Sequence, residues 1–493
     1  MKRTAVINVV GLTEALIGEH TPRIRDFVRA GALAHVAPTF PAVTCSAQST
    51  YLTGKPPSAH GIVGNGWYHR EQAEVLFWKQ SNHLVHGAKL WDELRAQEPE
   101  FTCAKLFWWF NMYSSADYSI TPRPMYPADG RKLFDIYAWP YSIRSEIKSD
   151  LGEFPFPTFW GPAAGVTTPK SEPDAASRWI AESAKWIEKK YRPTLNLIYL
   201  PHLDYNLQRH GPFAENPLTR PSATLSPSDG ERDGVRGAQR LNPAIVPDLR
   251  AIDAIVGDLI DSFRARDVQV VLLSEYGITN VDTPVHLNRV FRQNNWLTVK
   301  EELGLELLDC GASKVFAVAD HQVAHIYLND RSLETPVRKL LESWDGVAGV
   351  WGREEKIAAG LHHPRAGDLI AVAAPNAWFT YYYWLDDDCA PDFARCVDIH
   401  RKPGYDPVEL FLNPETKLVK AKIAWRLLQK KLGFRMLMDV IPLDATLVKG
   451  SHGRRPENPQ DWPVFITERR ELLQVPQIES TDVYHALLRH VRH

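Results

Sequence analysis

Residues 40–65 read FPAVTCSAQSTYLTGKPPSAHGIVGN, and this run contains a candidate nucleophile. A turn at Pro41 and the small and polar residues after it predict a helix that begins near Thr44 and ends at the TGKPP turn. The free N–H groups at the start of a helix favour a bound phosphate or alkoxide. Thr44 is therefore a candidate nucleophile. A threonine before a helix is also a common N-cap, and this alternative stays open for Thr44.

Apolar segments alternate with amphipathic ones along the chain. Strands are predicted at residues 5–10, 33–38, 194–199 and 268–273, and helices at 21–32 and at about 248–266. Such alternation predicts an α/β fold with a largely parallel sheet and helices on both faces. Ligands of such sheets bind beyond the carboxyl ends of the strands. The segments that follow three of these strands, from Gly11 onward, 202–212 and 274–277, are therefore expected to meet at one rim.

The opening run resembles the type I phosphodiesterase and nucleotide pyrophosphatase branch of the alkaline phosphatase superfamily. That branch has FPxxT, a helix, TGxxPxxHGI and a closing Asn. The matching residues here are Phe40, Pro41, Thr44, Thr53, Gly54, Pro57, His60, Gly61, Ile62 and Asn65. The resemblance implies an alkaline phosphatase-like α/β fold and hydrolysis of a phosphate ester or diester. It also implies that Thr44 takes the phosphoryl group and that Asn65 donates a hydrogen bond to a phosphate oxygen.

In that family two divalent metals activate the nucleophile and stabilise the transition state, and the resemblance identifies their ligand positions in this chain. At the first metal position Asp204 and His452 match the family pattern. Gln208 stands where the family has His. A Gln carbonyl oxygen suits Mg, Ca or Mn more than Zn.

The second metal position is more altered. Val10 stands where the family has Asp and cannot ligate a metal, while Asn8 nearby is expected to be a buried, hydrogen-bonded strand residue. Glu275 replaces the Asp of the family and keeps a carboxylate that is a candidate metal ligand, whereas Tyr276 replaces the His and can still donate a hydrogen bond to phosphate. We therefore expect one divalent metal, of which Zn, Mn, Mg and Ca are not distinguished, rather than a two-metal centre.

Several further residues are candidates for substrate binding or for replacing a lost ligand. His202 and His210 flank Asp204, His400 lies in DIHRKPGYDP, and Arg454 directly follows the His452 motif. The alternative for His202 and His210 is a solvated loop, and for Arg454 a solvated surface. The segment VADHQVAHIYL, residues 318–328, offers Asp320, His321 and His325, but its alternation also suits an ordinary strand.

We expect a single alkaline phosphatase-like domain over residues 1–493 with two interruptions. Residues 107–162 are crowded with Trp, Tyr, Phe and Pro, which predicts a cap-like insertion with little regular structure. Its aromatic residues either pack a core or form a platform for a substrate group. Residues 217–246 are rich in Pro, Ser, Gly and charge, which predicts a mobile loop.

Composition narrows the class of partner. The chain of 493 residues has 59 acidic and 57 basic side chains, a net charge of −2, so it lacks the basic excess of a nucleic-acid-binding or membrane-surface protein. No apolar run approaches the ~18 residues of a membrane span. The five cysteines, Cys45, Cys103, Cys310, Cys389 and Cys396, are scattered and are expected to be reduced thiols of a cytoplasmic protein. The expected partner is a small-molecule phosphate ester, and the oligomeric state stays open.

Three functions remain open at this level. The first is a metal-dependent hydrolase of a phosphate ester or diester, of the phosphodiesterase or nucleotide pyrophosphatase kind, with Thr44 as nucleophile. The second is a catalytically altered or inactive member of the family that binds a small molecule or acts as a scaffold. The third is phosphoryl or sulfuryl transfer, or C–P bond cleavage. Retention of Thr44, Asn65, Asp204 and His452 together favours the hydrolase.

Overall fold

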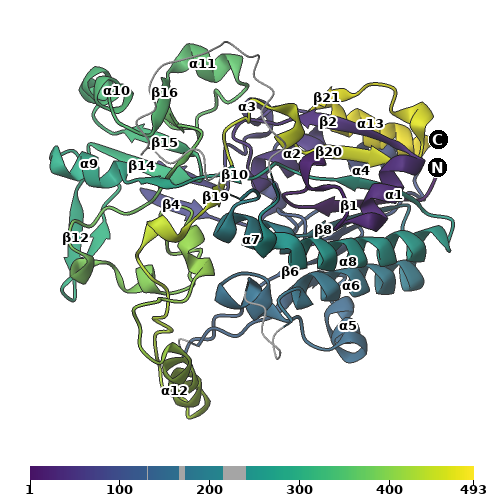
Figure 1. Cartoon of the computed structure of the whole chain (residues 1–493), viewed down its shortest axis with the longest axis horizontal. Coiled ribbons are helices and arrows are strands. Elements are labelled where there is room, and N and C mark those ends of the chain that lie inside the picture. The colour runs from purple at the N-terminus through teal and green to yellow at the C-terminus, as the bar shows by residue number, and fades with distance from the viewer. Residues whose placement is uncertain (130, 166–171, 215–239) are drawn as a thin grey trace, which may run out of the picture.

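The computed structural model describes residues 1–129, 131–165, 172–214 and 240–493. Its largest element is a nine-stranded sheet, shown at the right of Figure 1. In spatial order its strands are β21 (Gln477–Glu479), β2 (Ala32–Ala37), β20 (Val464–Thr467), β9 (Gln269–Leu273), β1 (Thr4–Val9), β8 (Leu195–Leu200), β5 (Cys103–Leu106), β6 (Tyr118–Pro122) and β7 (Ile136–Trp139). All the strands run parallel except β20 and β7. The predicted fold class is confirmed.

Helices cover both faces of this sheet. The helices of this part are α1 (Pro22–Ala30), α2 (Thr44–Thr53), α3 (Pro57–His60), α4 (Leu90–Gln97), α5 (Ser142–Leu151), α6 (Ala175–Tyr191), α7 (His202–His210), α8 (Val246–Arg264) and α13 (Asp482–Arg492). Figure 1 shows α6 and α8 below the sheet and α13 above it, where α13 packs on α2 and α4. Because both faces are covered, all six residues of β1 are buried, as expected for a central parallel strand.

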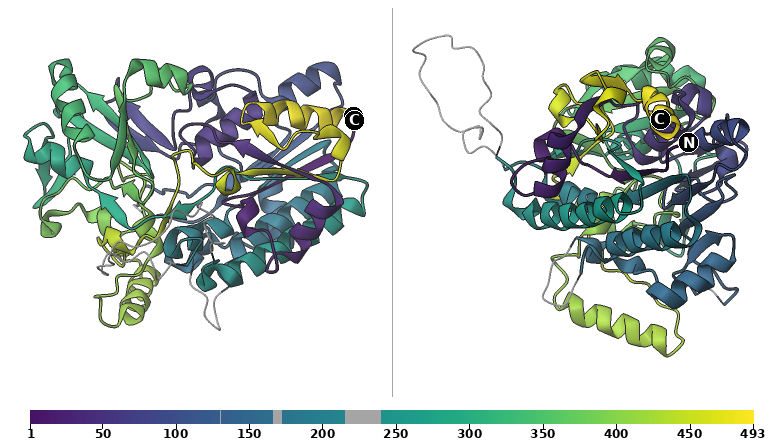
Figure 2. Two further views of the ribbon diagram at one scale, coloured as in Figure 1. Left: turned by 45° about the horizontal axis from the view of Figure 1, so that its top comes forward. Right: turned by 90° about the vertical axis from the view of Figure 1, so that its right-hand side faces the viewer.

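A second, four-stranded sheet lies beside the first and has its own hydrophobic cluster. Its order is β14 (Val315–Asp320), β15 (Val323–Leu328), β17 (Leu369–Ala373) and β16 (Val347–Trp351), and every pairing is antiparallel. The helices α9 (Leu287–Gln293), α10 (Glu334–Glu342) and α11 (Arg353–Ala358) belong to this part, shown at the left of Figure 1. The remaining helix, α12 (Val419–Lys431), projects from the body, as both views of Figure 2 show.

Four two-stranded ribbons complete the strands of the described residues. They pair β3 (Gly66–His69) with β4 (Glu74–Phe77), β10 (Thr279–Asn280) with β19 (Gly450–Ser451), β11 (Thr283–Val285) with β18 (Ala377–Phe379), and β12 (Val299–Glu302) with β13 (Leu305–Leu308). The β10–β19 ribbon matters most for the site, because it joins the segment after Tyr276 to the segment before His452.

The expectation of little regular structure in residues 107–162 is wrong. This segment supplies β6, β7 and α5, and the two strands extend one edge of the nine-stranded sheet. The aromatic side chains of Phe107 and Trp108 are buried in the core of that sheet. The composition misled because strands of only four and five residues carry too short an alternation to stand out among the aromatic and proline residues.

The structure describes only a small part of the predicted mobile loop, whereas it describes all five cysteines. The predicted mobile loop, residues 217–246, lies outside the described residues up to residue 239. All five cysteines are unpaired. No helix among the described residues has the length and apolar character needed to cross a membrane.

Candidate active site

Thr44 is the first residue of α2. The preceding residue, Val43, has extended backbone angles and takes the N-cap position, so the alternative of Thr44 as an N-cap is wrong. Gly54 ends the helix in the left-handed region with φ of 65°, as the TGKPP turn predicted. All ten residues of α2 are buried, and Thr44 itself is 3% exposed. The candidate nucleophile therefore lies at a helix N-terminus inside the protein.

A line of hydrogen bonds connects the Thr44 hydroxyl to a buried carboxyl group. The Thr44 Oγ1 atom lies 3.3 Å from the Tyr276 hydroxyl, which donates to Asp204 Oδ1 at 3.1 Å. Gln208 Nε2 donates to the other oxygen, Oδ2, at 2.7 Å, and the Tyr405 hydroxyl donates to Gln208 Oε1 at 3.0 Å. Burial raises the pKa of Asp204 to about 7, although the bonds from Gln208 and Tyr276 oppose this shift.

Glu275 is held by two amides at the end of β9. Asn8 Nδ2 and Gln48 Nε2 both donate to Glu275 Oε1 at 2.5 Å, so Asn8 is the buried, hydrogen-bonded strand residue that was expected. The other oxygen, Oε2, is buried and has no hydrogen-bond partner among the described residues. Burial raises the pKa of Glu275 to about 8, while the bonds from Gln48 and Asn8 oppose this shift.

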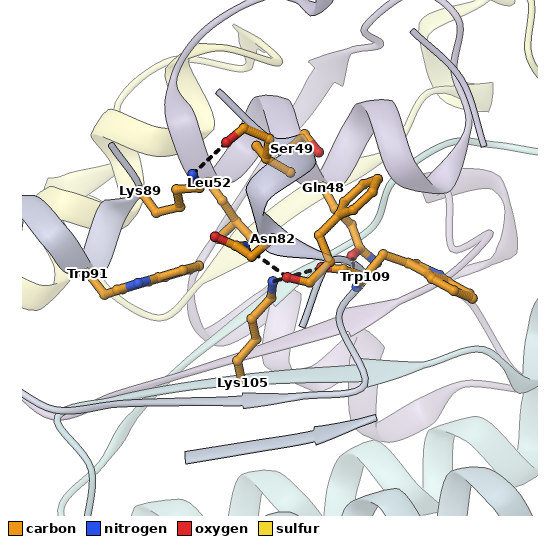
Figure 3. Close-up of a pocket in the computed structure, with 10 residues that line it drawn as sticks. Gln48, Ser49, Leu52, Asn82, Lys89, Trp91, Lys105 and Trp109 are labelled. Carbon is orange, nitrogen blue, oxygen red and sulfur yellow. Dashed lines mark hydrogen bonds between the residues drawn. The ribbon is translucent and has the colours of Figure 1, made fainter. Parts of the chain in front are cut away.

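Behind α2 a buried lysine supports this arrangement, as Figure 3 shows. Lys105 Nζ donates to the main-chain oxygens of Trp109 and Phe110 at 2.7 and 3.0 Å, and Trp109 N donates to Gln48 Oε1 at 2.7 Å. The group lines a pocket of about 10 Å³, the size of a single water. Burial lowers the pKa of Lys105 to about 7. The aromatic run at residues 107–110 thus supports α2 and through Gln48 positions Glu275.

Asn65 faces a carboxylate from the second sheet. Asp320, the last residue of β14, accepts hydrogen bonds from Asn65 N at 2.7 Å and from Asn65 Nδ2 at 3.1 Å. The Asn65 Oδ1 atom accepts from Cys45 N at 3.0 Å, which fixes Asn65 to the start of α2. Burial raises the pKa of Asp320 to about 6 against the effect of the Asn65 N–H. The amide expected to hold phosphate therefore holds Asp320 in this structure.

Four rings stack beside these carboxyl groups. The His452 ring lies 3.6 Å from the Tyr276 ring and 3.7 Å from the His321 ring, whose other neighbour is Tyr405 at 3.6 Å, measured between centroids. His452 Nδ1 bonds to Ala42 O and His321 Nδ1 to Asp320 Oδ1, both at 2.8 Å. Burial lowers the pKa of both imidazoles well below its usual value, so both are neutral.

The residues at the expected metal positions do not fit a metal centre as they are arranged. Both oxygens of Asp204 accept hydrogen bonds, and the Gln208 carbonyl oxygen is bound to Tyr405. Among the atoms expected to bind the first metal, His452 Nε2 is the only one without a hydrogen-bond partner in the described part of the chain. The described residues hold no group of three or more His, Cys, Asp and Glu side chains placed to bind an ion. In this arrangement the hydroxyl group of Tyr276 and the amide group of Gln208 bond the carboxyl group of Asp204 that the family pattern assigns to a metal.

The structure brings together Thr44, Asn65, Asp204, Gln208, Glu275, Tyr276 and His452 and places the other candidates elsewhere. His202 is buried rather than solvated, and its Nε2 lies 2.8 Å from Asp248 Oδ1. His210 ends α7 half-buried, with burial lowering its pKa. His400 Nδ1 lies 3.3 Å from the Phe77 carbonyl oxygen, and Arg454 lies 3.6 Å from the exposed Glu457. These three contacts join His202, His400 and Arg454 to partners other than Thr44.

Asp320 and His321 belong to the site, which the strand-like alternation of their segment did not predict. VADHQVAHIYL is not one strand but two, joined by a turn at which His321 has φ of 62°, and this turn carries Asp320 and His321 into the site. The Asp-His dipeptide between two apolar runs was the available signal. Tyr405, which reaches Gln208 and His321, gave no signal beyond its position in a Gly-Tyr-Asp-Pro turn.

Comparison with known proteins identifies a family for this chain. The family model described as type I phosphodiesterase / nucleotide pyrophosphatase matches residues 4–406. A search of curated protein sequences gave no match.

Several solved structures are similar to this chain over almost its whole length. Phosphonoacetate hydrolase from Sinorhizobium meliloti 1021, in complex with phosphonoformate, has a TM-score of 0.57 and 13% identity over 99% of this chain and 96% of its own. Murine ectonucleotide pyrophosphatase/phosphodiesterase 5 has a TM-score of 0.55 and 14% identity over 100% and 95%. An inactive variant of that murine protein, in complex with AMP, has a TM-score of 0.54 and 14% identity over the same shares. At this identity the likeness establishes the fold.

Proposed function

Because the chain belongs to the type I phosphodiesterase/nucleotide pyrophosphatase family, we propose that it hydrolyses a small-molecule phosphate ester or diester with Thr44 as nucleophile. The observation that carries this proposal is the hydrogen-bonded line from Thr44 through Tyr276 to Asp204. A pKa of about 7 makes Asp204 a proton acceptor near neutral pH, as a general base requires.

The proposed first step exchanges one bond at phosphorus. The Thr44 oxygen attacks phosphorus, its proton passes to the Tyr276 oxygen, and the Tyr276 proton passes to Asp204. The bond from phosphorus to the leaving oxygen breaks, and that oxygen takes a proton from solvent. Water then attacks phosphorus and the Thr44–phosphate bond breaks; Asp204 returns its proton through Tyr276 to the Thr44 oxygen, and the water releases one proton to solvent. The N-terminus of α2 favours the negative charge on the phosphoryl group.

Asn65 contributes to the proposed reaction only after Asp320 releases it. A substrate oxygen and the Asp320 carboxylate compete for the same Asn65 Nδ2 donor. With a pKa of about 6, Asp320 is protonated more readily than an ordinary aspartate, and protonation weakens its hold as an acceptor. We propose that substrate takes this position on Asn65 during the reaction.

Activity on a panel of substrates tests the proposal. We expect the wild-type chain to release nitrophenol from bis(4-nitrophenyl) phosphate or 4-nitrophenyl phosphate, with phosphonoacetate as a third arm for C–P cleavage. Thr44→Ala should abolish turnover, while Thr44→Ser keeps a hydroxyl and should keep measurable activity. Thr53→Ala is the matched control, because it removes a threonine hydroxyl at the other end of α2, where Thr53 Oγ1 bonds only Ser49 O and Lys55 N. An unchanged rate in Thr44→Ala would contradict the proposal.

The sequence also predicted one divalent cation, and this prediction is separate from the nucleophile. Elemental analysis of the purified chain, run beside the activity panel, decides it. A ratio near one ion per chain supports the prediction and shows that Asp204, Gln208 or Tyr276 rearranges to bind it. A ratio near zero in active protein supports the hydrogen-bonded arrangement as the working site.

One observation favours a second function, in which the chain binds a phosphate compound without turnover. Asp320 occupies the Asn65 donors, and Val10 and Tyr276 stand at metal positions. This function predicts that AMP raises the melting temperature while every arm of the panel stays inactive. Turnover that depends on Thr44 would contradict it.

A further inference from the structure

The helix α12 has no buried residue, which sets it apart from the long helices around the sheets. It projects from the body as the yellow-green helix at the bottom of Figure 1 and of the right-hand view of Figure 2. One of its sides faces the protein, where Val419 and Ile423 pack half-buried on the second hydrophobic cluster. Lys422 and Arg426, on the same side, pair with Asp439 at 2.9 and 3.0 Å. These contacts hold α12 to the rest of the protein along one side.

The opposite side of α12 exposes large apolar residues. Leu418, Trp425 and Leu432 recur every seven residues and are 81%, 57% and 64% exposed, with Leu428 between them. The exposed Phe434 and Leu437 continue the apolar surface past the end of the helix. Soluble proteins seldom leave such a contiguous apolar surface uncovered unless it binds something. We call residues 416–438 the α12 arm.

The same arm is strongly basic. It holds seven Lys and Arg residues and no Asp or Glu, in a chain whose net charge is −2: Lys417, Lys420, Lys422, Arg426, Lys430, Lys431 and Arg435. Lys417, Lys420 and Lys431 are exposed. The near-neutral balance of the whole chain, which argued against a membrane partner, conceals this local excess.

A neighbouring loop enlarges the apolar surface. Lys430 Nζ lies 5.6 Å from the centre of the Phe134 ring, and Arg435 donates to Asp129 O at 2.9 Å. Phe134, together with Met125 and Tyr126 of the same loop, is exposed. The arm and this loop therefore present apolar and basic groups together.

We propose that the α12 arm binds the surface of an anionic lipid bilayer, with its apolar residues inserted among the headgroups and its basic residues on lipid phosphates. A helix with Trp, Leu and Phe on one side and Lys and Arg beside them has the chemistry of an interfacial membrane helix. A second copy of this chain fits less well, because two arms would bring together ten basic side chains that form no ion pair among the described residues. The inference does not depend on the proposed reaction.

Co-sedimentation of the full chain with lipid vesicles tests this proposal. We expect binding to vesicles of 70% phosphatidylcholine and 30% phosphatidylglycerol, at least tenfold weaker binding to pure phosphatidylcholine, and weakening at 0.5 M salt. The triple variant Trp425→Ser, Leu428→Ser, Leu432→Ser and the charge variant Lys420→Glu, Lys431→Glu should each lose at least tenfold in affinity. All five positions are exposed, so the fold should be retained.

Matched controls change the same chemistry elsewhere. Ile357→Ser with Leu385→Ser replaces two exposed apolar residues outside the arm, and Lys189→Glu with Lys339→Glu replaces two exposed lysines. These controls should bind as the wild type does. Absence of wild-type binding to anionic vesicles, or equal binding by the arm variants, would overturn the proposal. So would a dimer in sedimentation velocity that the serine variant dissociates while vesicles have no effect.

Discussion

The carboxylate of Asp320 accepts hydrogen bonds from both the main-chain and the side-chain amide of Asn65. A phosphate that binds Asn65 as proposed must therefore displace a like charge from that donor.

Removing that charge should improve anion binding. Asp320→Asn keeps a carbonyl oxygen that can accept from Asn65 N but loses the negative charge, so inorganic phosphate should bind about tenfold more tightly by isothermal titration calorimetry, equivalent to ~1.4 kcal/mol. Asp345→Asn, at an exposed position, is the control and should leave the affinity unchanged. Equal or weaker binding in Asp320→Asn would show that phosphate does not use Asn65.

Loss of the Tyr276 hydroxyl should break the proton path. In Tyr276→Phe we expect kcat to fall by about 100-fold with KM changed less than threefold, the size of a general-base effect. The hydrogen bond from Tyr276 lowers the pKa of Asp204, so its loss should raise that pKa and move the acid limb of the kcat profile from near pH 7 to higher pH. Tyr405→Phe removes a hydroxyl that contacts Gln208 and not Asp204, and it should have the smaller effect. Equal losses in the two variants would indicate a packing role.

Replacing one residue should restore a metal site. Gln208→His places an imidazole beside Asp204 and His452, which gives the three donors of a typical zinc site. We expect zinc to bind at least 100-fold more tightly than to the wild type in competition with a chromophoric chelator. Gln208→Leu removes the same amide without adding a ligand and is the control. Failure of Gln208→His to gain affinity would mean that Tyr276 holds Asp204 too firmly.

Lys105 should make stability depend on pH. Its pKa of about 7 in the folded chain lies below the ordinary value of 10.5, so between these values the unfolded chain binds more protons. The free energy of unfolding should therefore gain, from this residue, up to ~1.4 kcal/mol per pH unit as pH rises. Urea unfolding at pH 8, 9 and 10 should show this as a difference between wild type and Lys105→Met. The exposed Lys339→Met should match the wild type. Parallel curves for wild type and Lys105→Met would refute the low pKa.

Particular residues show how far the sequence alone predicts this molecule. The strands at β1, β2, β8 and β9 lie within one residue of their predicted bounds, because buried parallel strands are continuous apolar runs. Comparison with the family motif identified Val10, Gln208 and Tyr276 as changes at expected metal-ligand positions. The hydrogen bonds of the site could not be predicted in this way, because those from Tyr276 to Asp204 and from Asn65 to Asp320 join residues 72 and 255 positions apart. The first pair meets because β9 and β8 lie near each other in the nine-stranded sheet, and the second pair meets because the two sheets pack together.

The two walls of the site come from different sheets, and this affects how the protein loses the proposed activity on unfolding. Thr44 and Asp204 are held by the nine-stranded sheet, whereas Asp320 and His321 come from a hairpin whose core is the separate second cluster. Heat or a substitution that loosens the hairpin would dismantle one wall while the other stayed folded. Damage far from Thr44 can thus disturb the proposed reaction before the molecule as a whole melts.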